Sequence, residues 1–285
     1  MTSMLEVVDL NVHFSTSRGP VKAVDGVSFA VDPGERLGLI GESGSGKSTI
    51  ALATMRLIKA PGRIVSGRIL LDGVDLLALT DEEMRRQRLA KIALVTQGAM
   101  NSLNPVLRIR PQIIDGMTAH GIRLTKREGE ARVTELLHSV DLSPDVADLY
   151  PHQLSGGMKQ RVCIAAAICL GPKVIIADEP TSALDVVVQK RVMETLRRVQ
   201  DELGAAVILI GHDIGLMAHF AQRVAVMRGG RLLEMNGVKE IFAHPNHPYT
   251  RLLMDSLPTF NREDSFLATA SLTAARLASA RNDAS

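Results

Sequence analysis

The sequence predicts an α/β fold whose parallel sheet is interrupted by an α-helical insertion. Two apolar runs, KVIIAD (173–178) and AAVILIGH (205–212), are typical of strands in a parallel sheet that is covered on both faces. The stretch LGLIGESGSGKST (37–49) places a glycine-rich loop between a strand and a helix. From about residue 98 to residue 170 the pattern becomes helical, and strand signals return only afterwards.

The first forty residues have the apolar and polar alternation of half-buried strands. Asp32-Pro33-Gly34 has the composition of a turn, so it separates two of these strands. We therefore expect strands at LEVVDLNVHF (5–14), VKAVDGVSFAVD (21–32) and RLGLIG (36–41).

The segment after the glycine-rich loop predicts a helix, a strand and a second helix. The first helix should run to about Ile58, and GRILLDGVDL (67–76) is typical of a single strand. Thr80 and Glu83 form a capping box, in which each side chain binds the backbone amide of the other residue at a helix start. ALVTQ (93–97) then predicts a buried strand that ends in a polar residue.

A second capping box, at Thr125 and Glu128, predicts a helix within the insertion. Beyond the insertion, an apolar stripe at helical spacing ends at Gly204, which is a typical helix stop. RVAVM (223–227) and RLLEMN (231–236) complete the predicted sheet. The stripe consists of Val188, Val192, Leu196, Val199 and Leu203.

The composition is that of a soluble globular protein without a nucleic-acid partner. Apolar residues make up 46% of the chain and charged residues 22%, while the formal charge is only +2. Aromatic residues reach only 3%, and no run of Lys or Arg is present, which argues against a nucleic-acid surface. The polar, Ala/Ser-rich stretch from Asn261 predicts a short helix or disorder.

The chain has no run of the roughly 20 apolar residues that a membrane-spanning helix needs. The most apolar candidate, VCIAAAICL (162–170), is nine residues long, and the first ten residues lack the basic-then-apolar layout of a signal peptide. Any membrane role should therefore come through a partner.

Cys163 and Cys169 are the only cysteines, and both fall on one predicted helix. Six helical residues separate them by about 9 Å along the axis, which is too far for a disulfide between them. We interpret both as small apolar core residues of a protein in a reducing cytoplasm.

The stretch GESGSGKST fits the pattern G-x-x-x-x-G-K-[ST] of loops that wrap phosphates. Its glycines allow backbone amides to point inward, and the following helix adds the positive end of its dipole. Lys47 would reach the β- and γ-phosphates, and the Ser48 hydroxyl would bind Mg²⁺. The predicted phosphate-binding residues are Gly41, Glu42, Ser43, Gly44, Ser45, Gly46, Lys47, Ser48 and Thr49.

Two adjacent acids end the apolar run VIIADEP (174–180). Asp178 is placed to hold Mg²⁺ through water, and Glu179 to polarise an attacking water molecule. Two acids at a strand end are also compatible with a solvated turn. The phosphate loop upstream favours the catalytic interpretation.

The stretch LSGGMKQR (154–161) predicts a second anion site at a helix N-terminus, formed by Ser155, Gly156 and Gly157. One nucleotide does not need two such cradles in one chain. We therefore expect the second cradle to contact the γ-phosphate that another subunit binds. The active unit should then be a head-to-tail pair.

Together these stretches resemble the ATP-binding subunit of ABC transporters. LSGGMKQR is similar to the signature motif, GESGSGKST to the Walker A motif and VIIADEP to the Walker B motif. TSALD (181–185) resembles the D-loop, which contains Asp185. The resemblance implies a RecA-like P-loop nucleotide-binding core with an antiparallel β subdomain and an inserted α-helical subdomain.

The resemblance also assigns roles to single residues. Gln97 would contact Mg²⁺ or the attacking water and sense the transmembrane partner. His212 would contact the γ-phosphate and orient the water, although a lone His after a strand is often a structural group. Phe14 would stack on adenine, with a core Phe as the alternative. The metal-binding set would be Ser48, Gln97 and Asp178.

The resemblance implies one ABC ATPase domain over residues 4–258. Its core would span about 4–97 and 171–240, with the helical insertion at about 98–170. Residues 259–285 would form a polar tail, either disordered or with a short helix.

SLNP (102–105) and EIFAHPNHPYTRLLMDSLP (240–258) resemble the oligopeptide/dipeptide, or nickel, importer subunits. His244 and His247 have metal-like spacing, but no Cys or carboxylate cluster accompanies them, so we expect a turn there instead. Gly98 and Gly211 depart from the family pattern beside Gln97 and His212. The chain has no cysteine after Cys169, so no iron–sulfur centre is predicted.

The predicted function is ATP hydrolysis, through head-to-tail dimer closure, that energises an importer of peptides. The implied ligands are ATP and Mg²⁺, and the implied partners are membrane permeases, a second ATPase of the same or a related chain and, indirectly, a solute-binding protein. The chain would lie peripherally at the cytoplasmic face of the bacterial inner membrane. Alternatives are another solute (nickel, a glutathione-like compound, a sugar or an opine derivative), a soluble ABC ATPase without a transport role, or a P-loop kinase.

Overall fold

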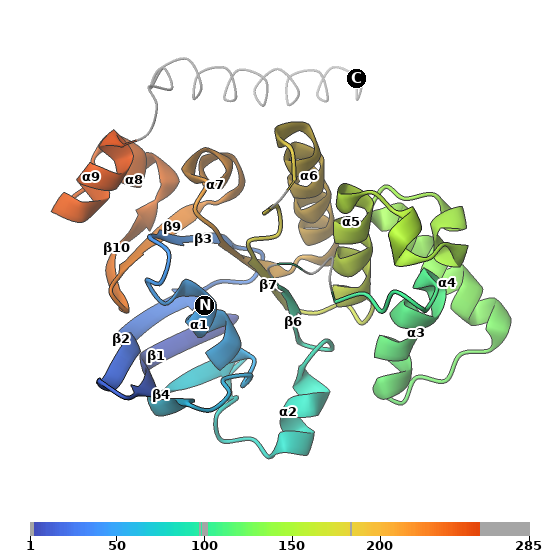
Figure 1. Cartoon of the computed structure of the whole chain (residues 1–285), viewed down its shortest axis with the longest axis horizontal. Helices are drawn as coiled ribbons and strands as arrows, with labels where there is room; N and C mark the ends of the chain where they lie inside the picture. Colours follow the sequence, from blue (N-terminus) through green and yellow to red (C-terminus); the bar gives the residue numbers. More distant parts are fainter. Residues whose placement is uncertain (1–2, 97, 99–101, 183, 257–285) are drawn as a thin grey trace, which may run out of the picture.

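The chain folds into two sheets with helices around them (Figure 1). The computed structural model describes residues 3–96, 98, 102–182 and 184–256. The first sheet has four strands in the order β2-β1-β4-β5, and its pairs are antiparallel. Its strands are β1 Leu5–Thr16, β2 Gly19–Val31, β4 Gly62–Leu71 and β5 Val74–Asp75.

The second sheet has six strands in the order β10-β9-β3-β8-β7-β6. All its neighbouring strands are parallel except β10, which pairs antiparallel with β9 at one edge. The predicted parallel core is therefore present. Its strands are β3 Arg36–Gly41, β6 Ile92–Val95, β7 Val174–Asp178, β8 Ala206–Ile210, β9 Arg223–Arg228 and β10 Arg231–Gly237.

The helices fall into two groups, one in the insertion between β6 and β7 and one in the rest of the chain. The middle of the chain, between β6 and β7, forms a helical group at one side of the molecule (Figure 1). These helices are α3 Ile109–Ala119, α4 Lys126–Ser139 and α5 Gly156–Ala167, with the short 3₁₀ helices Pro144–Asp148 and Pro151–Gln153. The others are α1 Lys47–Thr54, α2 Asp81–Gln87, α6 Val186–Leu203, α7 Ile214–Phe220, α8 Val238–Ala243 and α9 Pro248–Asp255.

The strands of the parallel sheet are buried on both faces, and each face belongs to a different core. In β8, Val207 and Leu209 pack with the helical side, which includes α5 and α6. Ile208 and Ile210 of the same strand pack with α1 and the antiparallel sheet. This alternation is why the run AAVILIGH contains no polar residue before its end.

The helix after the glycine-rich loop ends at Thr54, four residues before the predicted end. Arg56 has a positive φ of 49°, and the chain closes the helix with bonds from Arg56 N to Ala53 O and from Leu57 N to Leu52 O. The Arg56 guanidinium stabilises this unusual stop by donating to the Leu79 carbonyl (2.6 Å).

Two other expectations needed correction. The strand predicted at 67–76 is divided into β4 and β5, because Asp72 and Gly73 both take positive φ and form a hairpin turn. The apolar stripe of α6 is buried at Val192, Leu196 and Val199 only. Leu203, the last predicted member, is 41% exposed.

Both cysteines are buried, and within the described residues neither forms a disulfide, as the sequence predicts. Burial raises the pKa of each thiol to about 11, so both are protonated at neutral pH. Among the residues that the structure describes, no helix is both long enough and apolar enough to span a bilayer.

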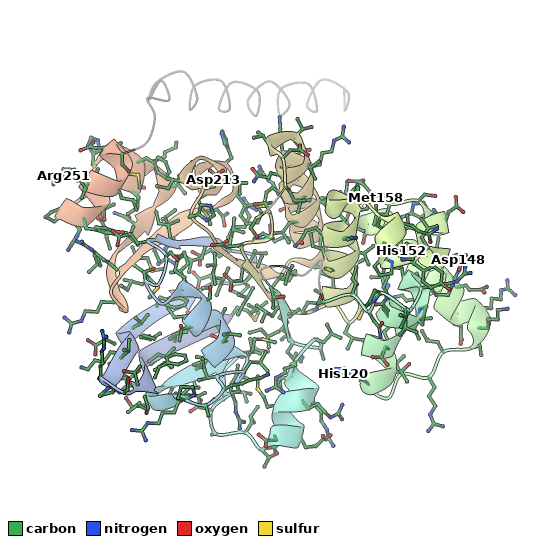
Figure 2. The ribbon with its side chains drawn as sticks, in the orientation of Figure 1. His120, Asp148, His152, Met158, Asp213 and Arg251 are labelled. Atoms are coloured by element: carbon green, nitrogen blue, oxygen red, sulfur yellow. The ribbon has the colours of Figure 1, made fainter. Side chains whose placement is uncertain are left out.

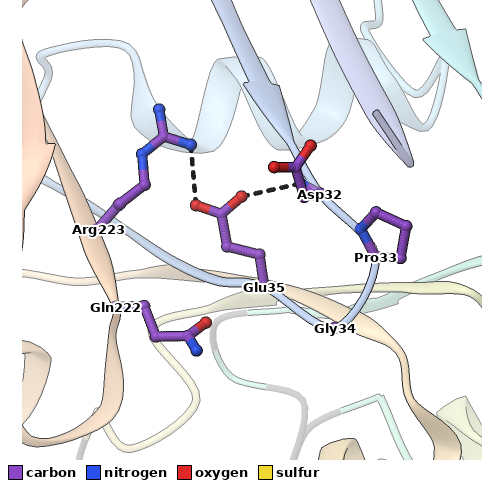
Figure 3. Close-up of a pocket in the computed structure, with 6 residues that line it drawn as sticks. All are labelled: Asp32, Pro33, Gly34, Glu35, Gln222 and Arg223. Atoms are coloured by element: carbon purple, nitrogen blue, oxygen red, sulfur yellow. Dashed lines mark hydrogen bonds and ion pairs between the residues drawn. The ribbon is translucent and has the colours of Figure 1, made fainter. Parts of the chain in front are cut away.

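The turn between β2 and β3 carries a surface pocket of about 290 Å³ (Figure 3). Glu35 orders it by accepting from Asp32 N (2.8 Å) and from the Arg223 guanidinium (2.9 Å). This pocket lies where β3 begins, whereas the glycine-rich loop follows the end of β3. It is therefore a structural feature of the end of the sheet at which the parallel strands begin, opposite the end that carries the loop.

Both predicted capping boxes form, and they provide a stability test. In α4, the Thr125 hydroxyl accepts from Glu128 N, and the Glu128 carboxylate accepts from Thr125 N (2.7 Å). We expect Thr125→Ala to lower the free energy of unfolding by about 1 kcal/mol in urea denaturation. Thr118→Ala on the exposed side of α3 is the matched control and should change it by less than about 0.5 kcal/mol. Equal effects of the two substitutions would contradict the cap assignment.

Candidate functional site

The glycine-rich loop connects the end of β3 to the start of α1 and packs tightly on its surroundings. Gly41 has a φ of 145°, and a Cβ at this position would lie 2.1 Å from the Met227 carbonyl oxygen. Gly46 has a φ of 103°, and its Cβ would lie 2.2 Å from the Ala23 carbonyl oxygen. Both positions therefore require glycine for conformation and for space.

Lys47 lies inside this loop with only 7% of its surface exposed. Its Nζ donates to the carbonyl oxygens of Gly41 and Glu42, each at 2.8 Å, and to Ser45 Oγ at 3.2 Å. Burial lowers the pKa of the ammonium group, while nearby carboxylates, chiefly Glu179, oppose that shift. The loop thus encloses a cation whose present partners are all neutral oxygens.

Ser48 and Asp178 meet where α1 begins and β7 ends. Ser48 Oγ donates to Asp178 Oδ1 at 3.0 Å. Asp178 is 7% exposed, and its burial raises the pKa of the carboxyl group, which the Ser48 bond partly offsets. A hydroxyl and a carboxylate side by side are the oxygen ligands that Mg²⁺ prefers, so these two residues fit that ion.

Glu179 and His212 form the next pair along the same sheet edge. His212 Nδ1 lies 3.3 Å from Glu179 Oε1. Glu179 has a positive φ of 46°, a conformation that is uncommon for a residue with a side chain and recurs at functional sites. Its amide donates to the Ile210 carbonyl (2.9 Å), so the end of β8 holds the strained residue in place.

The signature segment is ordered by contacts within its own helices. Ser155 Oγ accepts from Met158 N (3.3 Å) at the start of α5. A Cβ on Gly157 would lie 2.4 Å from Val188 Cγ1, so α5 and α6 cross closely there. Figure 2 shows Met158 in the helical group, well away from Asp213, which follows His212. Within the described ranges, no hydrogen bond joins Ser155 to the glycine-rich loop.

Two further predicted residues have local structural roles. Asp185 caps α6, where its Oδ1 accepts from Val188 N (3.0 Å). Phe14 is partly buried, packs with the core of the antiparallel sheet and lies against Gly62, at which a Cβ would be 2.5 Å from its ring. Phe14 thus contributes to packing, and its contact with adenine stays a prediction.

The remaining predictions concern Gln97, the C-terminal tail, Gly98 and Gly211. Gln97 lies outside the described residues, as does the tail from residue 259 onward, so both expectations stay predictions. Gly98 has a positive φ of 68°, and a Cβ on Gly211 would lie 2.9 Å from Met217 Cε. The backbone conformation at Gly98 and the close packing at Gly211 therefore each favour glycine at these two positions, which depart from the family pattern.

Three contacts around the site had no signal in the sequence. Ser182 Oγ donates to the Glu179 carbonyl (3.0 Å) and supports the strained residue from the chain that follows it. Met227 supplies the carbonyl that excludes a side chain at Gly41. Tyr249 packs near the loop from the C-terminal helix α9. The Ser182 contact is a local turn, whereas the contacts of Met227 and Tyr249 join segments that are distant in the chain, which a linear motif does not record.

The sequence belongs to a known family. The ABC transporter family matches residues 24–182, and the C-terminal region of oligopeptide/dipeptide transporters matches residues 233–281. The chain is 45% identical to the dipeptide transport ATP-binding protein DppD of Haemophilus influenzae, over 90% of this chain and 78% of that protein. It is 43% identical to the oligopeptide transport ATP-binding protein OppD of Bacillus subtilis, over 91% of this chain and 73% of that protein.

Solved structures agree with this assignment. The dimeric post-hydrolysis state of the ATP-binding cassette MJ0796 bound to ADP and Pi is 28% identical, with a TM-score of 0.74 over 82% of this chain and 99% of that chain. CbiO1 of Clostridium perfringens is 30% identical, with a TM-score of 0.72 over 86% and 92% of the two chains. The predicted fold class is confirmed as that of an ABC ATPase cassette. The chain belongs to the ABC transporter family, and within it to the ATP-binding subunits of the oligopeptide/dipeptide type.

The two glycines of the loop offer a matched test. Gly41→Ala would place its Cβ 2.1 Å from Met227 O, whereas a Cβ on Gly44, where φ is 77°, meets no atom within 4 Å. We expect Gly41→Ala to weaken binding of a fluorescent ATP analogue more than tenfold, and to destabilise the fold by at least about 2 kcal/mol. Gly44→Ala should cost only about 1 kcal/mol of backbone strain. Similar losses in both variants would show that the close approach at Gly41 is unimportant.

Proposed function

We propose that the described edge of the parallel sheet is the ATP hydrolysis site of a peptide importer, and that this chain drives import by closing on a second ATPase subunit. The observation that supports this most strongly is the grouping of three features at one sheet edge. These are the loop around Lys47, the Ser48–Asp178 pair and the Glu179–His212 pair. Phosphate binding, metal binding and water activation each need one of them.

Binding of ATP starts with the loop. Lys47 Nζ would exchange its bonds with the Gly41 and Glu42 carbonyls for charged bonds to the β- and γ-phosphate oxygens, which are stronger acceptors. Ser48 and Asp178 would hold Mg²⁺, with Gln97 as a further ligand. Mg²⁺ bound there would neutralise part of the negative charge of the phosphates.

Hydrolysis then depends on Glu179. Its carboxylate would accept a hydrogen bond from the attacking water and draw the proton toward Glu179 Oε while the water oxygen bonds to the γ-phosphorus. The bond between the γ-phosphorus and the β–γ bridging oxygen breaks, which releases ADP. His212, at 3.3 Å, would orient the carboxylate and contact the γ-phosphate. The backbone at Glu179 is fixed by Ile210 and Ser182 before substrate arrives, so less reorganisation is needed.

The signature segment would complete the site of another subunit. Ser155, Gly156 and Gly157 begin a helix, and in the part of the chain that the structure describes they make no hydrogen bond to the glycine-rich loop, which supports a role toward a partner's γ-phosphate. Asp185 would lie at the contact between the subunits. The dimeric MJ0796 structure is consistent with such a pair. The second subunit would be a copy of this chain or a related ATPase.

The named relatives support peptides as the transported solute. DppD and OppD are named for dipeptide and oligopeptide transport, and the C-terminal region matches that of such transporters. Permeases would carry the solute across the membrane and receive it from a solute-binding protein. The chain would then act at the cytoplasmic face of the bacterial inner membrane.

A single substitution tests the catalytic assignment. We expect Glu179→Gln to lose at least about 99% of ATP turnover, since removal of a general base typically costs about 10²-fold or more. Binding of ATP should persist, because the loop is unchanged. Steady-state phosphate release and equilibrium binding would measure the two effects. Glu202→Gln, at an exposed position on α6, is the matched control, and near-normal turnover in Glu179→Gln would refute the assignment.

Partner identity tests the transport assignment. We expect a tagged copy of the chain to co-purify, from detergent-solubilised membranes, with two membrane permeases and an ATPase subunit. The solute-binding protein encoded with those permeases would then be assayed with dipeptides, oligopeptides and nickel. Recovery of ribosomal or DNA-repair proteins without a permease would contradict the transport function while leaving the ATPase assignment intact.

A further inference from the structure

The C-terminal helix α9 packs near the glycine-rich loop through the side chain of Tyr249. Tyr249 is 4% exposed, and the Arg228 guanidinium lies over its ring, with Cζ 4.5 Å from the ring centroid. Arg228 ends β9, directly after Met227, which pairs with Gly41 in the sheet. Figure 1 shows α8 and α9 beside β10 and β9, at the end of the molecule opposite the helical group. The ring therefore lies close to the segment that carries the loop.

The segment before Tyr249 is fastened to the sheet by one carboxylate. Glu234 of β10 accepts from Asn246 N (2.9 Å) and from His247 N (3.0 Å). His247 Nδ1 in turn accepts from Tyr249 N (3.1 Å), so this histidine caps α9 and does not need a metal to explain it. The placement of Tyr249 is thus fixed independently of the loop.

The same part of the sheet also contacts the loop directly. The turn between β9 and β10 donates from Gly230 N to the Ser45 carbonyl at 3.1 Å. Ser45 is itself a loop residue and a partner of Lys47. The C-terminal segment and the phosphate-binding loop consequently share one rigid support.

The hydroxyl of Tyr249 is unusual because it is buried and has no well-formed hydrogen bond to any described residue. Such a group costs about 1–3 kcal/mol, so its retention calls for an explanation. Burial raises the pKa of this hydroxyl; the Glu42 amide opposes the shift, and the Glu42 carboxylate adds to it. Glu42, the second residue of the loop, is therefore near this hydroxyl, as the pairing of Met227 with Gly41 and the stacking of Arg228 on the Tyr249 ring also indicate.

Glu42 is also the residue whose surroundings must change when phosphates bind. Its carbonyl accepts from Lys47 Nζ at 2.8 Å. In the proposed reaction Lys47 turns to the phosphates, so Glu42 loses that partner and the loop readjusts. That readjustment is the step at which we expect the Glu42 carboxylate to accept a hydrogen bond from the Tyr249 hydroxyl.

We propose that Tyr249 is a positioning residue for ATP binding, whose hydroxyl donates to the Glu42 carboxylate when the loop closes on the phosphates. The C-terminal segment thereby stabilises the nucleotide-bound loop without contacting the nucleotide. This inference rests on the proposed function of the loop. It adds a second support to the loop, from a part of the chain that lies beyond the parallel sheet.

Tyr249→Phe tests the proposal because it removes the hydroxyl and keeps the ring under Arg228. We expect the full-length variant to bind Mg²⁺-mant-ATP, a fluorescent ATP analogue, about 3- to 10-fold more weakly, as the loss of one hydrogen bond implies. The KM for ATP should rise by the same factor, while turnover at saturating ATP stays within about twofold. Tyr150→Phe is the matched control, since Tyr150 is the other tyrosine and also lies beneath an arginine, Arg108 (5.2 Å). It should leave both constants unchanged.

A double-mutant cycle identifies the partner of the hydroxyl. In a Glu42→Ala background, Tyr249→Phe should weaken binding by less than about twofold, because the acceptor is already gone. Without nucleotide, Tyr249→Phe should melt at the same temperature as the unsubstituted chain or slightly higher, since it removes an unsatisfied hydroxyl.

Two results would overturn the proposal. One is unchanged binding of mant-ATP by Tyr249→Phe. The other is that Tyr249→Phe weakens mant-ATP binding by the same factor in the unsubstituted chain and in the Glu42→Ala background. Lys47→Ala separates this question from the function itself. If the unsubstituted chain binds mant-ATP no better than Lys47→Ala, the proposed function fails, and the inference fails with it. If only Lys47→Ala is impaired, the function stands and the role of Tyr249 is wrong.

Discussion

The site depends on the parallel register of three adjacent strands, β3, β8 and β7. Ile210 of β8 lies opposite Leu39 on one side and opposite Asp178 on the other. Strands β7 and β8 therefore end at the same level, and β3 ends two residues further along at Gly41, so the residues that follow the three strands meet at one end of the sheet. Without this register the glycine-rich loop, the acidic pair and His212 would be three unrelated segments.

The same edge concentrates groups that are costly to bury. Lys47 and Asp178 are each 7% exposed. Burial lowers the pKa of Lys47 and raises the pKa of Asp178, so in both cases it favours the neutral form. Carbonyls around Lys47 and the hydroxyl of Ser48 offset part of that penalty. A site assembled in this way is ready for a polyphosphate and a divalent cation, because both replace neutral partners with charged ones.

Contacts from neighbouring and from distant parts of the chain hold this edge in shape. The end of β8 and Ser182 hold Glu179 in a strained conformation, Met227 fixes the space around Gly41, and the β9–β10 turn binds the loop through Ser45. Strain at a functional residue persists only where the surroundings over-determine it. The antiparallel sheet has a comparable supporting role, since it packs on α1 and covers the second face of the parallel strands.

The sequence alone determined the α/β class, the capping boxes, most strand positions and the loop, because each of these follows from local spacing and periodicity. It misplaced the end of α1 and the division between β4 and β5, where the backbone adopts positive φ at Arg56 and Asp72. Tertiary structure alone decided which carbonyl excludes a side chain at Gly41 and which strand end holds Glu179. Those contacts join residues that are distant in the chain, and their geometry depends on packing that no local pattern encodes.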